Sequence, residues 1–171
     1  GINPDAYRRI ITIMKRKGAT TVLDADGDNL RCGVRACPDY IKPNRHEIRE
    51  LVGRDLTSLE DFVQAAEEVR SQGVGTVLVS LGADGMMAVA EGKRYLAIPP
   101  TVETVNNVGL GDSAVAGFMY GLANHLDLQD CLVHGTAAGT ATAMKPGTAR
   151  ASKEDVMAMV PRIEFKDLTE G

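Results

Sequence analysis

Short runs of apolar and β-branched residues alternate along this chain with stretches of helical periodicity. The clearest run is TVLVSL, Thr76 to Leu81, and two shorter ones are TTVLD, Thr20 to Asp24, and DYIK, Asp39 to Lys42. TVLVSL is almost continuously apolar rather than alternating, which is typical of a strand buried on both faces in a parallel sheet. The pattern therefore predicts an α/β fold, with a mostly parallel central sheet covered by helices on both faces.

The stretches between these runs carry start and stop signals of helices. The expected helices run from Asn3 and Pro4 to the stop signal at Lys15–Gly18, weakly around Leu30 and Val34, from Asn44 to Val52, from about Ser58 to Gln72, and from Gly111 to Met144 with a break near Asp127. The helix at Ser58 is predicted to open with a Thr57-x-x-Glu60 capping box, and Ser152-x-x-Asp155 predicts the cap of a last helix. MMAVA and RYLAI, which follow GADG, predict an antiparallel extension of the sheet.

Composition and charge exclude several classes of protein. The 171 residues have the usual length of one domain, and no linker or repeat divides them. Lysine plus arginine is 19 against 23 acidic residues, a net charge of 19 − 23 = −4, and no basic stripe is present, so we expect no nucleic-acid partner. No window is apolar enough for a membrane helix, and no signal peptide is recognisable, so we expect no membrane partner. Cys32, Cys37 and Cys131 form neither an even set nor a CxxC pair, which predicts reduced thiols and a cytoplasmic location.

The most informative segment is NNVGLGDSAVAGF, Asn106 to Phe118, in which a glycine-rich turn runs into an alanine-rich helix. Gly109 and Gly111 allow the backbone to approach a ligand closely, and the free amides of the first helical turn form an anion site. Asp112 falls in that first turn. It is a candidate for chemistry, and it is equally well placed to complement the helix dipole alone.

The letters GLGDSA also fit the dinucleotide fingerprint GxGxxA, so a dinucleotide-dependent oxidoreductase is one alternative. That fold needs a strand just before the turn, and a second strand about 20 residues later with an acid for the ribose. Here the predicted helix is followed by HLDLQD and another helix. The sequence also lacks a Walker A loop.

A second motif, IKPNRHE, Ile41 to Glu47, places a strand end, a proline turn and a helix start in succession. Asn44 and Glu47 are oxygen ligands three residues apart at the expected mouth of the sheet, where they could hold hydrated magnesium. The same spacing is an asparagine–glutamate capping arrangement. Both interpretations remain open from the residues alone.

A third motif, SLGADG, Ser80 to Gly85, follows the clearest strand. Gly82 and Gly85 can form a turn whose amides hold phosphate, and they also suit any tight turn between strands. Asp24 and Asp26 follow another strand, where they could face the site or simply form a turn, and the turn is the preferred interpretation.

Taken in order, KPNxxE, a strand ending in SLGxxG, and a VGxGD turn entering a helix resemble the nucleotide-binding half of the PfkB or ribokinase-like sugar kinases. Within that family, the KPN form and VLVSLGADG are similar to the 1-phosphofructokinase and tagatose-6-phosphate kinase branch. The resemblance covers nearly the whole chain. It implies a three-layer ribokinase-like sandwich with a mostly parallel central sheet. It also implies ATP-dependent phosphoryl transfer to a hydroxyl of a sugar phosphate, of the fructose 1-phosphate or tagatose 6-phosphate type.

The resemblance implies a role for each motif. The amides of Gly109, Leu110, Gly111 and Asp112 would form an anion hole, and Asp112 would accept the proton of the attacking sugar hydroxyl. Asn44 and Glu47 would organise Mg²⁺, largely through water. The residues expected against ATP are Lys42, Asn44, Ser80, Gly82, Gly85, Asn107 and Gly139. The last lies in GTAAGTATAMKPG, Gly135 to Gly147, which would wall the adenine pocket, although its small residues equally suit close helix packing.

The chain departs from the family pattern in the turn before the base, where members usually read TVGAGD or TTGAGD. Asn107 stands for the threonine and Leu110 for the small alanine. Backbone amides survive both changes, but a leucine side chain could crowd a turn that must approach phosphate closely. We therefore expect impaired rather than absent function at this turn.

The chain also resembles only one half of the family pattern. GINPDAY is similar to the point about midway along family members, whose first half supplies the sugar-contacting residues and the lid. We therefore expect residues 1–171 to be a single nucleotide-binding half-domain of an incomplete ribokinase-like fold, inactive alone as a sugar kinase. Exposed strand edges and apolar faces would drive formation of a homo-oligomer or pairing with the missing amino-terminal half. A non-catalytic nucleotide-binding module or an inactive fragment is the alternative.

Overall fold

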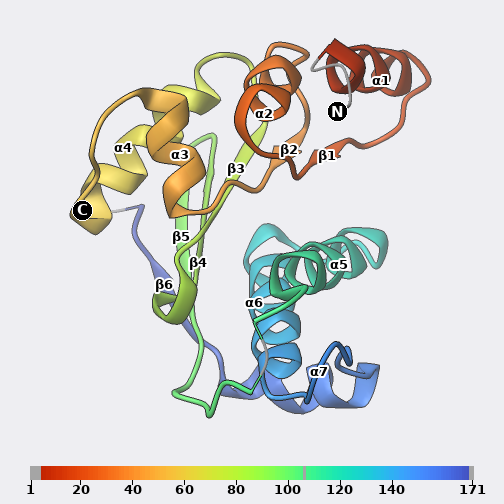
Figure 1. The fold of residues 1–171 in the computed structure, drawn as a ribbon, viewed down its shortest axis with the longest axis vertical. Coiled ribbons are helices and arrows are strands. Elements are labelled where there is room, and N and C mark those ends of the chain that lie inside the picture. Colours follow the sequence, from red (N-terminus) through yellow and green to blue (C-terminus); the bar gives the residue numbers. More distant parts are fainter. Residues whose placement is uncertain (1–4, 106, 170–171) are drawn as a thin grey trace. The chain divides into compact units, whose positions relative to one another are not determined.

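The structure is a computed structural model that describes residues 5–105 and 107–169 (Figure 1). The elements, in chain order, are α1 (Asp5–Arg16), β1 (Val22–Leu23), α2 (Gly27–Val34), β2 (Tyr40–Ile41), α3 (Arg45–Val52), α4 (Leu59–Arg70), β3 (Thr76–Ser80), η1 (Gly82–Asp84), β4 (Met86–Ala90), β5 (Lys93–Ile98), α5 (Leu110–Ala123), α6 (Leu128–Ala143), α7 (Lys153–Met159), η2 (Val160–Arg162) and β6 (Glu164–Asp167). The expected helix start at Asn3 and Pro4 lies outside the described residues, as does Asn106. No helix in the described residues is both long enough and apolar enough to span a bilayer.

The strands form one six-stranded mixed sheet in the order β1-β2-β3-β4-β5-β6. β1, β2 and β3 pair in parallel, with Leu23 opposite Ile41 and Ile41 opposite Val77. β5 pairs with β6 in antiparallel register. The α/β expectation is confirmed, but β6 was not predicted. Its sequence, EFKD, has only one apolar residue, Phe165, which packs edge-on against Tyr95 at a centroid distance of 5.2 Å.

Contacts divide the chain into two compact units. The first unit runs to Ser80 and includes Ala88–Arg94, and the second unit comprises Leu81–Met87 and the chain from Tyr95 onward. The single half-domain expected over residues 1–171 stays a prediction.

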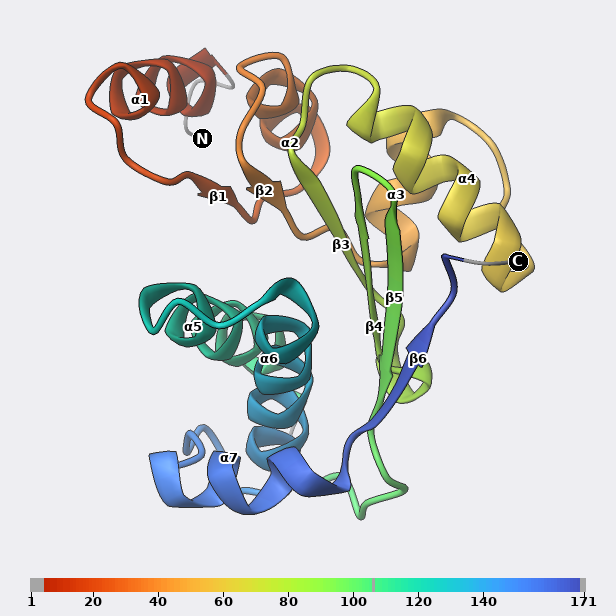
Figure 2. The same ribbon diagram turned by 180° about the vertical axis from the view of Figure 1, so that it is seen from behind.

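In the first unit, apolar strand residues form a core with the helices. Ile41 and Val77 are fully buried on adjacent parallel strands. Ile48 of α3 and Phe62 of α4 are also fully buried, and Figures 1 and 2 show these two helices side by side. Burial of the strands on both sides explains why their sequences do not alternate between apolar and polar residues.

The capping box of α4 lies one residue later than predicted. The Ser58 hydroxyl accepts a hydrogen bond from the Asp61 amide at 3.1 Å, and the Asp61 carboxylate accepts one from the Ser58 amide at 2.8 Å. The predicted pair of Thr57 and Glu60 was therefore wrong. Asp61 reaches back to the Thr57 amide as well, at 2.9 Å, so one short carboxylate serves both residues. The hydrogen bonds from the Ser58 and Thr57 amides hold the pKa of Asp61 well below its usual range.

In the second unit, α5 and α6 pack closely along small residues (Figure 2). A Cβ added at Gly117 would lie 2.5 Å from the His134 carbonyl oxygen, and one at Gly121 would lie 2.8 Å from the Cys131 sulfur. The helix break near Asp127 is confirmed, because the Asp127 side chain caps α6. The small residues of this region therefore include glycines that helix packing itself requires.

All three cysteines are free thiols, as expected. Cys131 is fully buried in the α5–α6 packing. Burial, with the nearby charges of Asp127 and Asp130, raises the pKa of the Cys131 thiol to about 11. Cys131 is therefore a structural rather than a reactive cysteine.

Candidate functional site

Three predicted site residues of the first unit meet at the carboxyl ends of the parallel strands. The Lys42 amide, just after β2, donates to the Leu23 carbonyl of β1 at 3.1 Å. Asn44 pairs with Ser80 as an isolated parallel bridge, and the Ser80 amide donates to the Pro43 carbonyl at 3.0 Å. Parallel strands place their carboxyl ends on the same side of the sheet, so Lys42, Asn44 and Ser80 lie near one another.

Lys42 is a buried cation with a carboxylate partner. It is 5% exposed, and its ammonium lies 3.2 Å from an Asp24 carboxylate oxygen. Asp24 follows β1 directly, and the preferred interpretation as a turn residue missed this pairing with Lys42. The available signal was an acid immediately after a β-branched run, at the sheet edge where the other motifs gather.

Asn44 and Glu47 form the capping box of α3. The Asn44 side-chain oxygen accepts from the His46 and Glu47 amides at 2.8 and 3.0 Å, and the Glu47 carboxylate accepts from the Asn44 amide at 2.7 Å. The capping interpretation is confirmed. The second carboxylate oxygen of Glu47 lies outside the capping box and is the one that could coordinate a cation or accept from its water, and Mg²⁺ that keeps most of its waters needs only one or two such oxygens.

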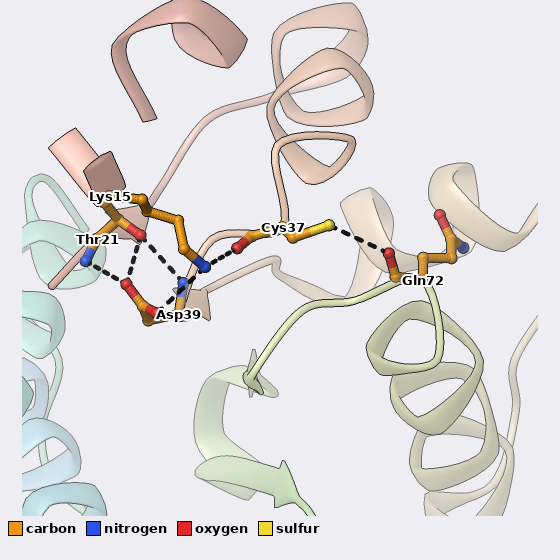
Figure 3. Close-up of polar contacts among 5 residues, drawn as sticks. All are labelled: Lys15, Thr21, Cys37, Asp39 and Gln72. Carbon is orange, nitrogen blue, oxygen red and sulfur yellow. Dashed lines mark hydrogen bonds and ion pairs between the residues drawn. The ribbon is translucent and has the colours of Figure 1, made fainter. Parts of the chain in front are cut away.

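A separate polar cluster lies where β1 and β2 begin (Figure 3). The Asp39 carboxylate accepts from the Thr21 amide at 2.8 Å and from the Thr21 hydroxyl at 2.7 Å, and it lies 3.3 Å from the Lys15 ammonium. Burial alone would raise the pKa of Asp39, but the Thr21 hydrogen bonds and Lys15 outweigh burial, so that pKa lies below its usual value. Lys15 also donates to the Cys37 carbonyl. This cluster lies at the amino ends of the strands, and it joins strands rather than forming a ligand site.

The SLGADG turn contributes Gly82 and Gly85 to the second unit. Both have positive φ angles, 66° at Gly82 and 101° at Gly85. A Cβ at Gly85 would lie 2.0 Å from the Ala97 carbonyl oxygen, whereas one at Gly82 would meet nothing within 4 Å. The fold itself therefore requires Gly85, and Gly82 keeps an open side to which a ligand could approach.

The first turn of α5 presents free amides beside a carboxylate. Gly109 is the N-cap with φ 73°, and no side chain caps the helix. The first helical hydrogen bond runs from the Ser113 amide to the Gly109 carbonyl at 3.0 Å. The amides of Leu110, Gly111 and Asp112 therefore have no acceptor among the described residues. The exposed side chain of Asp112 lies in the same turn.

Residues distant in sequence support this turn. The Thr142 hydroxyl, almost fully buried, donates to the Ser113 hydroxyl at 3.0 Å and accepts from the Ala151 amide at 3.3 Å. A Cβ at Gly109 would lie 2.5 Å from the Arg150 guanidinium carbon, so this cation lies against the start of α5. Sequence reasoning missed Ser113, Thr142 and Arg150, because no local pattern links them to the turn.

Gly139 and Asn107, two residues predicted to contact ATP, have less structural support than the others. Gly139 lies beside the start of α5, where an added Cβ would be 3.4 Å from the Leu110 carbonyl oxygen, an ordinary contact. Asn107 is exposed in the loop before α5. That loop separates α5 from β5, which ends at Ile98, and the next element after α5 is the helix α6. The strands that a dinucleotide fingerprint needs on either side of its helix are therefore missing from the described residues.

Two curated proteins that are similar to this chain are both 1-phosphofructokinases. The 1-phosphofructokinase of Escherichia coli (strain K12) is 31% identical over 166 residues, which are 97% of this chain and 53% of that protein. The 1-phosphofructokinase of Bacillus subtilis (strain 168) is 34% identical over 164 residues, which are 96% of this chain and 54% of that protein. The chain therefore spans about half the length of the curated relatives it matches.

A solved structure gives the same result for the fold. Phosphofructokinase-2 from Escherichia coli in complex with potassium is similar with a TM-score of 0.88 at 30% sequence identity, covering 94% of this chain and 53% of that one. This similarity confirms the predicted ribokinase-like fold class. The family model described as pfkB family carbohydrate kinase matches residues 1–155, and the chain belongs to this family.

Proposed function

We propose that this chain supplies the nucleotide site, the anion hole and the catalytic base for ATP-dependent phosphoryl transfer to a hydroxyl of a sugar phosphate. The acceptor would be of the fructose 1-phosphate or tagatose 6-phosphate type, and the relatives named 1-phosphofructokinase support the first of these. The observation that carries the proposal is the first turn of α5. There, the first-turn amides of Leu110 and Gly111, which no side chain caps in the part of the chain that the structure describes, stand beside the exposed carboxylate of Asp112.

This geometry suits phosphoryl transfer because that reaction depends mostly on positioning and on stabilisation of charge. Helix amides at an amino terminus attract and orient phosphate oxygens. The Arg150 guanidinium adds a positive charge at the same helix end. Asp112 would accept the proton of the attacking hydroxyl, and its exposure leaves it accessible to an acceptor.

The donor set of the first unit fits a hydrated magnesium ion. Bound Mg²⁺ would neutralise charge on the nucleotide phosphates. Glu47 has one carboxylate oxygen outside the capping box, and Asn44 holds the start of α3 in place. In the described residues, no three histidine, cysteine or acidic side chains gather as a metal cage, so contacts through water are the arrangement that these residues support.

MgATP binding is tested first, by thermal unfolding of the chain with MgATP and with NAD. Ligand at about 100 times its dissociation constant should stabilise the fold by about 2.7 kcal/mol. Stabilisation by MgATP but not by NAD supports a nucleotide site. Stabilisation by NAD but not by MgATP would point to the oxidoreductase alternative. Absence of any shift would contradict a nucleotide site in this chain and favour an inactive fragment.

The catalytic role is tested by Asp112→Asn, with Asp130→Asn as the control in the first turn of α6. The amino-terminal half of the Bacillus subtilis relative would be added in trans, with fructose 1-phosphate as acceptor. We expect Asp112→Asn to keep MgATP binding and to lower phosphoryl transfer by about 10²–10⁴-fold. MgATP binding without any transfer in the complemented wild type would favour a non-catalytic nucleotide-binding module.

The crowding expected at Leu110 is tested by Leu110→Ala. Leu110 is the first residue of α5 and is half-buried. A smaller side chain should tighten MgATP binding and raise turnover in the complemented enzyme. Unchanged binding and turnover would show that the leucine side chain points clear of the phosphate.

A further inference from the structure

A cavity of about 430 Å³ lies in the second unit between α5, α6 and α7. Small-molecule sites usually measure about 300–1,000 Å³, so this volume is sufficient for a ligand. One end begins at Asp112, and the other reaches Tyr120, about 12 Å further along α5 at 1.5 Å per residue. The predicted base Asp112 lines it, as do Ala138 and Thr142 of the segment Gly135 to Gly147, but none of the single residues predicted to contact nucleotide or magnesium does.

The polar groups of the cavity are predominantly positive. Arg150 and Lys153 both line it, and neither forms an ion pair with a carboxylate in the described ranges. The Lys153 ammonium lies 5.3 Å from the centroid of the Tyr120 ring. Arg150 lies against the start of α5, where the helix dipole is also positive. Asp112 is the one carboxylate among the lining residues, so an anion would enter a net positive field.

The other walls are apolar and aromatic. The rings of Tyr120 and His134 lie 5.9 Å apart at an interplanar angle of 32°. His134 is nearly buried, and its Nδ1 donates to the Asp130 carbonyl at 2.8 Å, which fixes the ring. Val156 and Met157 of α7 complete this end, and Tyr120 and Met157 remain partly open to solvent.

We infer that this cavity binds a small organic anion whose body is a planar aromatic or branched apolar group. The anionic group would lie toward the Lys153 ammonium, and the apolar body would lie between Tyr120 and Met157. The inference does not depend on the proposed kinase activity, because the apolar end lies two turns from the first turn of α5.

The experiment titrates the whole chain, carrying ¹³C-methyl methionine, with 1-naphthalenesulfonate, and follows the methyl signals by NMR. Met157 should shift in a saturable way, while Met14, an exposed methionine of the first unit, should not. The neutral analogue 1-naphthol should bind about tenfold more weakly than the sulfonate. Equal shifts at Met14 and Met157 would show non-specific adhesion and overturn the proposal.

Three variants locate the site. Ala116→Phe fills the cavity and should abolish the Met157 shift, whereas Ala123→Phe, on an exposed position at the end of α5, should leave it unchanged. Lys153→Gln, an exposed change that leaves the fold intact, should weaken sulfonate binding about threefold without affecting 1-naphthol. Sulfonate binding that is unaffected by both Ala116→Phe and Lys153→Gln would place the ligand elsewhere.

Discussion

At the scale of single residues, the pairing of Lys42 with Asp24 explains how a lysine is held almost completely buried at the sheet edge. A buried ammonium without a counter-charge is costly, whereas a paired one is tolerated. Asp24 is only one-third exposed, so solvent screens the pair weakly. The pair therefore fixes the Lys42 side chain at the carboxyl ends of β1 and β2.

We expect Asp24→Ala to lower the free energy of unfolding by about 2–3 kcal/mol, because it leaves the buried Lys42 ammonium unpaired. The double variant Asp24→Ala/Lys42→Met should recover most of this loss, since methionine fills the space without a charge. Urea unfolding measures both variants. Equal destabilisation in the single and double variants would contradict a charge-based explanation.

At the amino ends of β1 and β2, Asp39 makes the stability of the fold depend on pH. Its folded pKa lies below the unfolded value of about 3.9, so it stabilises the fold above that pH. The contribution is lost as pH falls through the folded pKa. Asp39→Asn should therefore cost about 1 kcal/mol at neutral pH and progressively less in acid. Asp55→Asn, an exposed control, should show no such dependence, and a pH-independent cost at Asp39 would refute the assignment.

At the scale of secondary-structure elements, close packing of α5 and α6 positions the candidate base. The hydrogen bond from Thr142 of α6 to Ser113 of α5 fixes the residue next to Asp112. Glycines allow the helices to approach closely, but the space around each glycine differs. Gly117 faces the His134 carbonyl with no room for a methyl group, whereas Gly139 has ordinary contact distances.

Gly117→Ala should lower the free energy of unfolding by about 1–3 kcal/mol, although alanine favours helices, because its Cβ forces α5 and α6 apart. Gly139→Ala should instead raise it by about 0.5–1 kcal/mol through helix propensity. Thermal unfolding compares the matched pair. An equal change in the free energy of unfolding in both variants would contradict the packing argument. Separately, if Gly139→Ala lost stabilisation by MgATP while remaining well folded, Gly139 would contact the nucleotide as predicted.

At the scale of the whole molecule, α1 carries an exposed apolar face. Ile10 and Ile13 are 55% and 47% exposed, and Met14 lies beside them at helical spacing. The curated relatives are about twice as long as the part of them that this chain matches. An exposed apolar stripe of this kind favours association with a second polypeptide.

We expect the chain to self-associate at high concentration. Addition of the amino-terminal half of a relative should dissociate this self-assembly. The double variant Ile10→Gln/Ile13→Gln should be a monomer, while Met119→Gln, an exposed position on α5, should behave as the wild type. Sedimentation velocity distinguishes these species. A monodisperse wild-type monomer would contradict the expectation.

The sequence by itself determined the features that depend on neighbours in the chain. Strand Thr76–Ser80, the α3 cap at Asn44 and the cap of α7 at Ser152 followed from patterns within a few residues. The glycine turn before Asp112 and the order of the motifs were sufficient for the family. The box at Thr57 was placed one residue early because serine and threonine are both good caps, and only the helix geometry distinguishes them.

Only the tertiary structure decided which side chains meet across the fold. Thr21 and Asp39 are 18 residues apart, and Ser113 and Thr142 are 29 apart. Their contacts depend on strand register and on the depth of helix packing, which no local pattern encodes. The pairing of Asp24 with Lys42, the Arg150 guanidinium at Gly109 and the polar edge strand β6 have the same origin. Local hydrogen bonds and periodicity therefore fixed the elements, and packing between distant residues fixed the charges around the candidate site.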